Sequence, residues 1–377
     1  MPLCVAVPDE TVPGERRVAV IPAVAEQLSQ QGLEVRIEAG AGAAAFYRDS
    51  EYTAAQLIND RAELFGGADI VLTVQPLDKE AIGQLKEGAT VIGFLHPHAN
   101  PECTALMRDR NITSFAMELI PRLSRAQGMD ALSSQASIAG YKAALMAASR
   151  TARFFPMLTT AAGTIRPAKV LVIGVGVAGL QAIATAKRLG AMVEAYDVRP
   201  ETREQVESLG AKFVDVHVKA EGSGGYAREL TEEEKQQEVA VLAEHVIQAD
   251  AIIATAGVPG KPAPCIISAA MVDEMKHGAV IIDLAAYSGG NCELTIPGES
   301  FGHDLVMIYG PLNVPAMMPV HASEMYAKNL FNFMSLIVHD GEINPDWEDE
   351  IVAASALTRD GKIQHKLTRE RIEGEPS

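Results

Sequence analysis

Three glycines and an aspartate are spaced as a nucleotide-binding turn requires. Gly174, Gly176 and Gly179 form a G-x-G-x-x-G pattern, and Asp197 follows about 20 residues later. In such a turn the glycines let the backbone approach a pyrophosphate, which then lies at a helix N-terminus. The carboxylate accepts hydrogen bonds from the adenosine ribose and would repel a 2′-phosphate. The pattern therefore indicates a dinucleotide site that favours NAD(H) over NADP(H).

The segments around these residues have the order that the site needs. The apolar run at 169–173 predicts a buried strand, 180–189 a helix that ends before Gly190, and 192–196 the next strand. Arg199 could accept a 2′-phosphate, but because the acid is retained we interpret it as a solvated residue of the cofactor-binding loop. The residues expected to bind the cofactor are Gly174, Val175, Gly176, Val177, Ala178, Gly179, Asp197, Val198, Arg199, Thr255, Ala256 and Gly257.

The composition is that of a globular chain of about two domains. It has 377 residues, of which 48% are hydrophobic and 21% charged. The formal net charge of −17 argues against nucleic acid or a bare anionic membrane as a partner. The cysteines are far apart and lack metal-ligand spacing, which favours a reduced, cytosolic compartment and no metal site. We expect neither a secretion signal nor a membrane-spanning segment.

Short apolar strands alternate with helical segments on both sides of the glycine turn. A helix at 22–31 follows the first strand, a long helix at 134–155 joins the two halves, and another at 323–338 returns the chain. This predicts an α/β fold of two Rossmann-like, doubly wound parallel-sheet domains joined by long helices. Residues 1–135 and 311–377 would form one discontinuous domain, and 136–310 the NAD(H)-binding domain. The predicted strands are 3–7, 34–37, 70–74, 91–95, 112–115, 213–214, 251–255, 280–284 and 306–309.

Several segments outside the turn resemble the nicotinamide-nucleotide transhydrogenase family. The resemblance is carried by PRLSRAQGMDALSSQ at 121–135, GYK at 140–142, PMLTTAAGT at 156–164, IDLA at 282–285 and GGN at 289–291. It extends over nearly the whole chain. Within that family the chain resembles the NAD(H)-binding component of the proton-translocating enzyme. That component binds NADH and passes hydride to NADP⁺ on a second component, while a membrane component couples the step to proton movement.

The resemblance implies that Arg122, Gln127, Asp130 and Ser133 are the catalytic residues around the nicotinamide and its ribose. Gln127 and Ser133 would hydrogen-bond the ligand, while Arg122 and Asp130 would form a charged pair. Hydride transfer between two nicotinamides moves no proton, so it needs ring positioning but no general acid, base or metal. The alternative is a capped loop with Asp130 as N-cap of the next helix. Tyr226, in a glycine-rich flap, would fold over the nucleotide, with a plain surface loop as the alternative.

The same resemblance implies partners and a location. It implies an NADP(H)-binding subunit and a membrane-spanning proton-channel subunit, together with a homodimer of this chain. The chain would be cytoplasmic and peripheral at the cytoplasmic face of the inner membrane, held there through these partners. Nucleic acid is not expected to bind.

Alanine dehydrogenase is similar to the same two-domain framework, and its N-terminal domain resembles the discontinuous domain predicted here. Arg17 and His96 match that family's substrate arginine and histidine. Gln75 and Tyr287, however, stand where it has a substrate lysine and a catalytic aspartate, and a neutral amide and a phenol cannot replace those charges. We therefore interpret His96 as structural and Arg17 as an interdomain contact. A non-catalytic NAD-sensing module is a third hypothesis.

Overall fold

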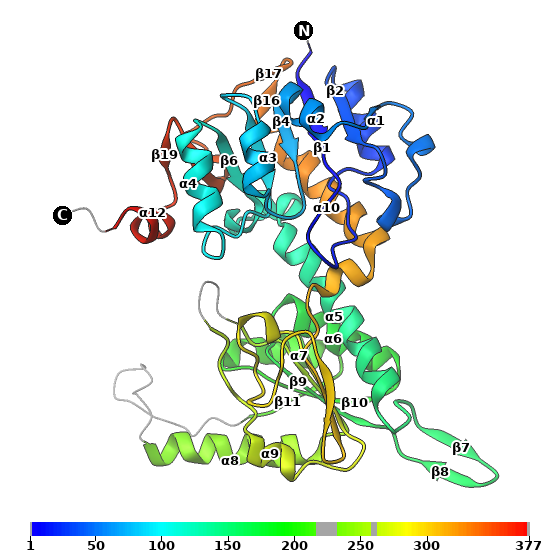
Figure 1. The fold of residues 1–377 in the computed structure, drawn as a ribbon. Coiled ribbons are helices and arrows are strands. Elements are labelled where there is room, and N and C mark those ends of the chain that lie inside the picture. The colour runs from blue at the N-terminus through cyan, green and yellow to red at the C-terminus, as the bar shows by residue number, and fades with distance from the viewer. Residues whose placement is uncertain (1, 216–231, 258–261, 375–377) are drawn as a thin grey trace. The chain divides into compact units, whose positions relative to one another are not determined.

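A computed structural model describes residues 2–215, 232–257 and 262–374 of the chain. The chain forms two compact units, one of residues 1–135 with 315–377 and one of residues 136–314. Each unit contains one large, mostly parallel sheet with helices around it (Figure 1). The predicted α/β class with two such sheets is confirmed.

The first unit is built on an eight-stranded sheet. Its strands are β1 (Cys4–Val7), β2 (Glu34–Glu38), β3 (Gln56–Ile58), β4 (Ile70–Leu72), β5 (Thr90–Gly93), β6 (Thr113–Ala116), β18 (Ala356–Arg359) and β19 (Lys362–Ile363). They lie in the order β19-β18-β6-β5-β4-β1-β2-β3. Strands β1 to β6 pair in parallel, whereas β18 pairs antiparallel with both β6 and β19. The carboxyl ends of β1, β4 and β5 therefore lie at the same edge of the sheet.

Alternate residues of these strands pack against helices on opposite faces of the sheet. The helices are α1 (Pro22–Gln30), α2 (Arg61–Gly67), α3 (Lys79–Gln84), α4 (Pro101–Asp109), α10 (Pro319–Met334), α11 (Glu350–Ser355) and α12 (Lys366–Glu373). Val5 and Ile70 share a core with α1 and α10, whereas their neighbours Ala6 and Val71 share one with α2, α3 and α4. Because side chains alternate along a strand, burial of both faces explains the continuous apolar runs.

The second unit is built on a seven-stranded sheet in the order β11-β10-β9-β12-β13-β15-β14. Its strands are β9 (Lys169–Ile173), β10 (Met192–Tyr196), β11 (Lys212–Phe213), β12 (Ala251–Ala254), β13 (Val280–Asp283), β14 (Ser300–His303) and β15 (Val306–Tyr309). Its helices include α6 (Val177–Arg188), α7 (Arg203–Ser208), α8 (Glu232–Gln248) and α9 (Ala269–Asp273). All neighbouring strands pair in parallel except β14 and β15. The strand order reverses at β9, and such a switch point is where parallel α/β sheets bind ligands.

The predicted long helices begin earlier than expected. The segment predicted at 134–155 is α5 (Ala131–Arg150), 180–189 is α6, and 323–338 is α10. Helix α5 begins at Ala131 because the Asp130 carboxylate accepts the Ser133 N–H at 2.9 Å, as an N-cap does. Helix α10 begins with Pro319, whose missing N–H costs nothing in the first turn.

Antiparallel strands were absent from the prediction. They include the hairpin of β7 (Leu158–Thr160) and β8 (Gly163–Ile165), the hairpin of β16 (Val338–His339) and β17 (Glu342–Ile343), the edge strands β14 and β19, and β18 beside β19. These strands have two to four residues, too few for a clear period-2 signal. Within the residues described, no helix combines the length and apolarity needed to cross a membrane.

Candidate functional site

The glycine turn joins β9 to α6 in the second unit. Gly174 has a φ of +90°, a conformation that favours glycine. A side chain on Gly179 would come within 1.9 Å of the Gly174 carbonyl oxygen, so glycine is needed for this approach of helix and turn. Gly176 is the N-cap of α6, and a side chain placed there would meet nothing within 4 Å. The turn therefore combines a helix N-terminus with open space, as phosphate binding requires.

Asp197 connects the end of β10 to this turn. It is 6% exposed, and its carboxylate accepts the N–H groups of Val175 at 2.7 Å and Arg199 at 2.9 Å. The Arg199 guanidinium donates to both oxygens, from Nε at 2.9 Å and Nη2 at 3.0 Å. Burial alone would raise the pKa of Asp197, but the hydrogen bonds from Arg199 and Val175 lower it. Arg199 is thus ion-paired with the acid, whereas the sequence suggested only a solvated residue.

The end of β12 lies beside the same turn. The Thr255 N–H donates to Ile173 O at 2.7 Å, and its hydroxyl donates to Gly174 O at 2.9 Å. A side chain on Gly174 would come within 2.8 Å of the Ala256 nitrogen. Residues 255–257 and the glycine turn therefore form one continuous backbone surface.

Most of the predicted cofactor-binding residues lie at this edge of the second unit. Val198 is 68% exposed and Val177 41%, so two apolar side chains border the turn on its solvent side. Tyr226 lies outside the described residues. The members that the structure places here are Gly174, Val175, Gly176, Val177, Ala178, Gly179, Asp197, Val198, Arg199, Thr255, Ala256 and Gly257.

The polar segment at residues 122–133 lies in the first unit. Its short helix η4 (Ser124–Met129) packs against α10, from which Asn329 and Asn332 donate to Gly128 O at 2.9 and 2.8 Å. Arg125 makes two hydrogen bonds to the Asp349 carboxylate, at 2.7 and 3.0 Å. Contacts to α10 and to the N-cap of α11 therefore fix the backbone of this segment.

The predicted catalytic residues on this segment differ in their contacts. Asp130 accepts the Ser133 N–H at 2.9 Å and the Ser133 hydroxyl at 2.6 Å, which is the capped-loop arrangement. No ion pair between Arg122 and Asp130 is found in the described residues, so the expected charged pair is absent. Arg122 and Gln127 are exposed, and Asp130 and Ser133 are half-buried.

Arg17 is buried in the first unit with a carboxylate partner. Its Nε and Nη2 donate to Glu15 at 2.8 and 2.6 Å, and its Nη1 donates to Gln135 Oε1 at 3.0 Å. Gln75 Nε2 donates at 2.7 Å to Glu15 Oε2, the same oxygen that Arg17 Nη2 contacts. Burial alone would raise the pKa of Glu15, but Arg17 lowers it to about 2. These partners of Arg17 belong to its own unit, and the expected interdomain contact stays a prediction.

His96 lies at the end of β5 and is held through its backbone. Its N–H and that of Leu95 donate to Glu118, and its ring stacks on Phe94 with centroids 5.9 Å apart. Burial raises the pKa of Glu118 to about 7, and burial with the charge of Arg17 lowers the pKa of His96. These contacts are consistent with a structural histidine.

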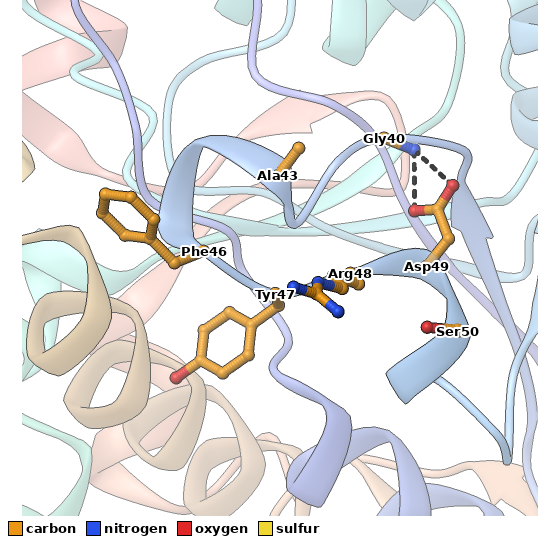
Figure 2. Close-up of a pocket in the computed structure, with 7 residues that line it drawn as sticks. All are labelled: Gly40, Ala43, Phe46, Tyr47, Arg48, Asp49 and Ser50. Atoms are coloured by element: carbon orange, nitrogen blue, oxygen red, sulfur yellow. Dashed lines mark hydrogen bonds between the residues drawn. The ribbon is translucent and has the colours of Figure 1, made fainter.

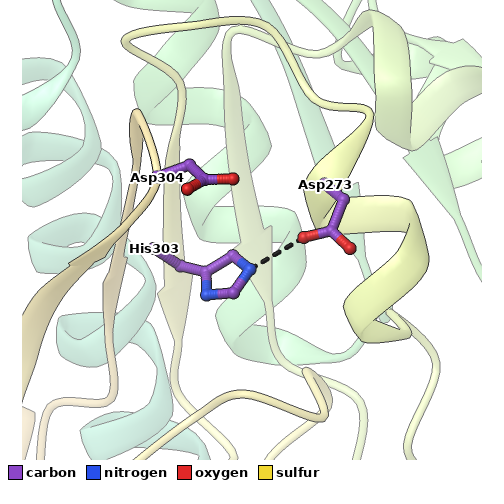
Figure 3. Close-up of side chains that lie close together, drawn as sticks. All are labelled: Asp273, His303 and Asp304. Carbon is purple, nitrogen blue, oxygen red and sulfur yellow. Dashed lines mark hydrogen bonds and ion pairs between the residues drawn. The ribbon is translucent and has the colours of Figure 1, made fainter.

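Two further features contain none of the predicted residues. An open pocket in the first unit is lined by Gly40, Ala43 and residues 46–50, where Asp49 accepts the Gly40 N–H at 3.0 Å (Figure 2). In the second unit Asp273, His303 and Asp304 have ligand atoms within 4.8 Å of one another (Figure 3). His303 Nε2 lies 2.8 Å from Asp273 Oδ1, and both aspartates are exposed. This hydrogen bond accounts for the short distance between Asp273 and His303.

Sequence reasoning missed two buried polar residues of the second unit. Asp283 and Asn291 are both 0% exposed, and Asn291 hydrogen-bonds the backbone of Ala256. Their only sequence signal was their membership of the IDLA and GGN runs, which could not show what they contact.

Both halves of the chain match domains of one known family. The model for the N-terminal domain of the alanine dehydrogenase/PNT family matches residues 6–139, and the model for its C-terminal domain matches residues 143–366. The chain belongs to the alanine dehydrogenase/PNT family. The family resemblance predicted from the sequence is therefore confirmed.

Within the alanine dehydrogenase/PNT family, the chain is more similar to transhydrogenase subunits than to alanine dehydrogenase. It is 46% identical over 374 residues to the first part of the NAD(P) transhydrogenase alpha subunit of Rhodospirillum rubrum, covering 96% of this chain and 97% of that protein. A transhydrogenase structure from Sinorhizobium meliloti matches with a TM-score of 0.87 and 42% identity, over 96% of this chain and 99% of that one. Alanine dehydrogenase of Mycobacterium tuberculosis is 31% identical over 326 residues, covering 84% of this chain and 82% of that protein.

Proposed function

We propose that this chain binds NAD(H) as the first portion of the alpha subunit of an NAD(P) transhydrogenase. It exchanges hydride directly with NADP(H) held on a partner subunit: NADH gives up one hydride and becomes NAD⁺, while NADP⁺ accepts it and becomes NADPH. The observation that carries the proposal is the near-full-length identity of 46% to such a subunit, combined with an intact glycine turn and acid.

The residues of the second unit fit the dinucleotide. The open N-terminus of α6 suits the pyrophosphate, and the Asp197 carboxylate suits the adenosine ribose hydroxyls. Arg199 shares both carboxylate oxygens, so ribose binding needs its guanidinium to shift. The acid disfavours a 2′-phosphate, which supports NAD(H) as the nucleotide on this chain.

We assign the nicotinamide half to the polar segment of the first unit on the strength of the family resemblance. Gln127 and Arg122 present exposed polar groups, and Ser133 offers a hydroxyl whose proton is engaged by Asp130. These residues need only position the nicotinamide ring, because hydride transfer between nicotinamides releases no proton. Tyr226 keeps its proposed role as a cover over the nucleotide.

The alternative of an amino-acid dehydrogenase is disfavoured by Gln75 and Tyr287. Gln75 stands where that family has a substrate lysine. Its amide already donates a hydrogen bond to Glu15, the carboxylate partner of Arg17. Tyr287 is 76% exposed and offers a phenol in place of a carboxylate. Identity to alanine dehydrogenase is also lower, at 31%.

The proposed partners are an NADP(H)-binding subunit, a membrane-spanning proton-channel subunit and a second copy of this chain. The name of the Rhodospirillum rubrum relative, which describes a first portion of an alpha subunit, supports further subunits. Exposed apolar side chains on and beside the β7–β8 hairpin, Phe154, Met157 and Ile165, support a homodimer contact there. The proposed location is the cytoplasmic face of the inner membrane, through these partners.

The test is reconstitution with the NADP(H)-binding subunit of a related transhydrogenase. NADPH should reduce an NAD⁺ analogue when both proteins are present and not with either alone. Turnover of pyruvate, ammonium and NADH by this chain alone would overturn the proposal in favour of an amino-acid dehydrogenase. NADH binding without turnover in the mixture would favour an NAD-sensing module.

A further inference from the structure

We propose that Asn291 is a positioning residue for the nicotinamide half of NAD(H), acting through the backbone of Ala256; the inference rests on the proposed function. Asn291 Oδ1 accepts the Ala256 N–H at 2.9 Å, and its Nδ2 donates to Ala256 O at 2.8 Å and to Pro264 O at 2.9 Å. One carboxamide thus satisfies both backbone polar groups of Ala256. Only an amide side chain offers this combination of one acceptor and two donors.

Asp283 fixes Asn291 from the other side. This aspartate is the last residue of β13, and it accepts the N–H groups of Asn291 at 2.7 Å, Cys292 at 3.0 Å and Ala285 at 3.0 Å. The Thr295 hydroxyl adds a fourth hydrogen bond at 2.7 Å. A buried carboxylate with four neutral donors is rigidly held, so the turn that carries Asn291 is held as well.

The effect of Asn291 reaches the glycine turn in one step. Ala256 follows Thr255, whose hydroxyl donates to Gly174 O, and the Ala256 nitrogen lies 2.8 Å from where a Gly174 side chain would begin. Displacement of residue 256 would therefore alter the surface next to the glycine turn, on the side away from Asp197.

The sheet order assigns this surface to the nicotinamide half. Asp197, at the end of β10, lies on one side of β9, and β12 and β13 lie on the other side. A dinucleotide crosses such a switch point, so its adenosine lies toward β10 and its nicotinamide riboside toward β12 and β13. Asn291 should consequently affect NADH but not a ligand that has only the adenosine half.

The test compares NADH with ADP, which lacks the nicotinamide riboside, by calorimetric titration of the full chain. Asn291→Asp keeps the shape but, when ionised, removes both donated hydrogen bonds, and Asn291→Ala removes all three. We expect each to weaken NADH at least tenfold while ADP affinity stays within twofold. The matched control is Asp250→Asn, at the amino end of β12, where a buried carboxylate accepts the Lys169 N–H at 2.8 Å. It should lower the melting temperature without this selectivity.

Equal losses of NADH and ADP affinity, or no loss of either, would overturn the role of Asn291. Absence of NADH binding by the unaltered chain would overturn the proposed function instead, so the two failures are distinguishable. A second measurement avoids any folding defect: in the unaltered chain, amide exchange at residues 251–257 should slow with NADH and not with ADP. Equal slowing by both ligands would also refute the inference.

Discussion

Asp197→Asn should weaken NADH binding and narrow the preference for NADH over NADPH. In the structure four donors converge on the carboxylate, from Val175, the Arg199 backbone and two nitrogens of the Arg199 guanidinium. An amide keeps one acceptor oxygen and replaces the other by an NH₂ group, which would face N–H donors. The variant therefore loses acceptor capacity at the point where the ribose must also be bound.

The magnitude follows from the kind of hydrogen bond that is lost. A hydrogen bond to a charged group contributes about 1.5–3 kcal/mol, and about 1.4 kcal/mol corresponds to a tenfold change in affinity. NADH affinity should fall about tenfold to a hundredfold. NADPH should lose less, because removal of the negative charge also removes its repulsion from the 2′-phosphate.

Calorimetric titration of both nucleotides at one ionic strength measures this directly. Asp215→Asn is the matched control, because Asp215 is an exposed acid of the same unit that is ion-paired with Arg203. It should leave both affinities within twofold. If Asp197→Asn lowered the affinities for NADH and NADPH by the same tenfold factor, the acid would support the fold of the turn and would not bind the ribose.

Three further predictions concern the first unit. Gln127→Ala should reduce the transhydrogenation rate at least tenfold and leave NADH affinity within twofold, because the proposed role of Gln127 is ring alignment. Gln27→Ala on the exposed surface is the control. Equal losses of rate and NADH affinity in Gln127→Ala would make Gln127 a plain binding residue. Arg17→Met removes the cation from the buried ion pair with Glu15 and should lower the free energy of unfolding by about 3–5 kcal/mol, measured by urea denaturation followed by the single tryptophan. Arg125→Ala, which breaks an exposed ion pair, is the control and should cost less than about 1 kcal/mol. Glu118 has its pKa raised to about 7, so the folded state holds a proton that the unfolded state has released, and stability should fall as pH rises from about 5 to 7. In Glu118→Gln this decrease of the unfolding free energy between about pH 5 and 7 should be smaller by about 1–3 kcal/mol. The same decrease in the variant and the unaltered chain would contradict the raised pKa of Glu118.

The glycine turn could be predicted from the sequence because its determinants are local. Strands β9 and β10 have the predicted bounds, 169–173 and 192–196, and Asp197 contacts the turn as its spacing suggests. The alternation of apolar runs predicted the parallel strands for the same reason. Periodicity within a short window carries both signals.

Contacts between distant residues could not be predicted. The pairing of Arg17 with Glu15 and Gln135 depends on two segments of the first unit that meet only in the folded chain. Asn291 and Ala256 are likewise joined by the parallel pairing of β12 and β13. Asp130 is a local case. Charge complementarity suggested Arg122 as its partner, but its carboxylate caps α5 through Ser133, three residues later, which is the alternative that the sequence also offered.

The discontinuous first unit has a consequence for the order in which the chain can fold as it is synthesised. Strand β6 ends at residue 116, but its antiparallel neighbour β18 begins only at residue 356, after the whole second unit has been made. The outer edge of β6 therefore remains unpaired while residues 136–314 are translated and can fold. An unpaired edge invites association with other chains, and long-range closure is slow. Translation stalled before β18 should therefore yield chains with a folded second unit and an aggregation-prone first unit.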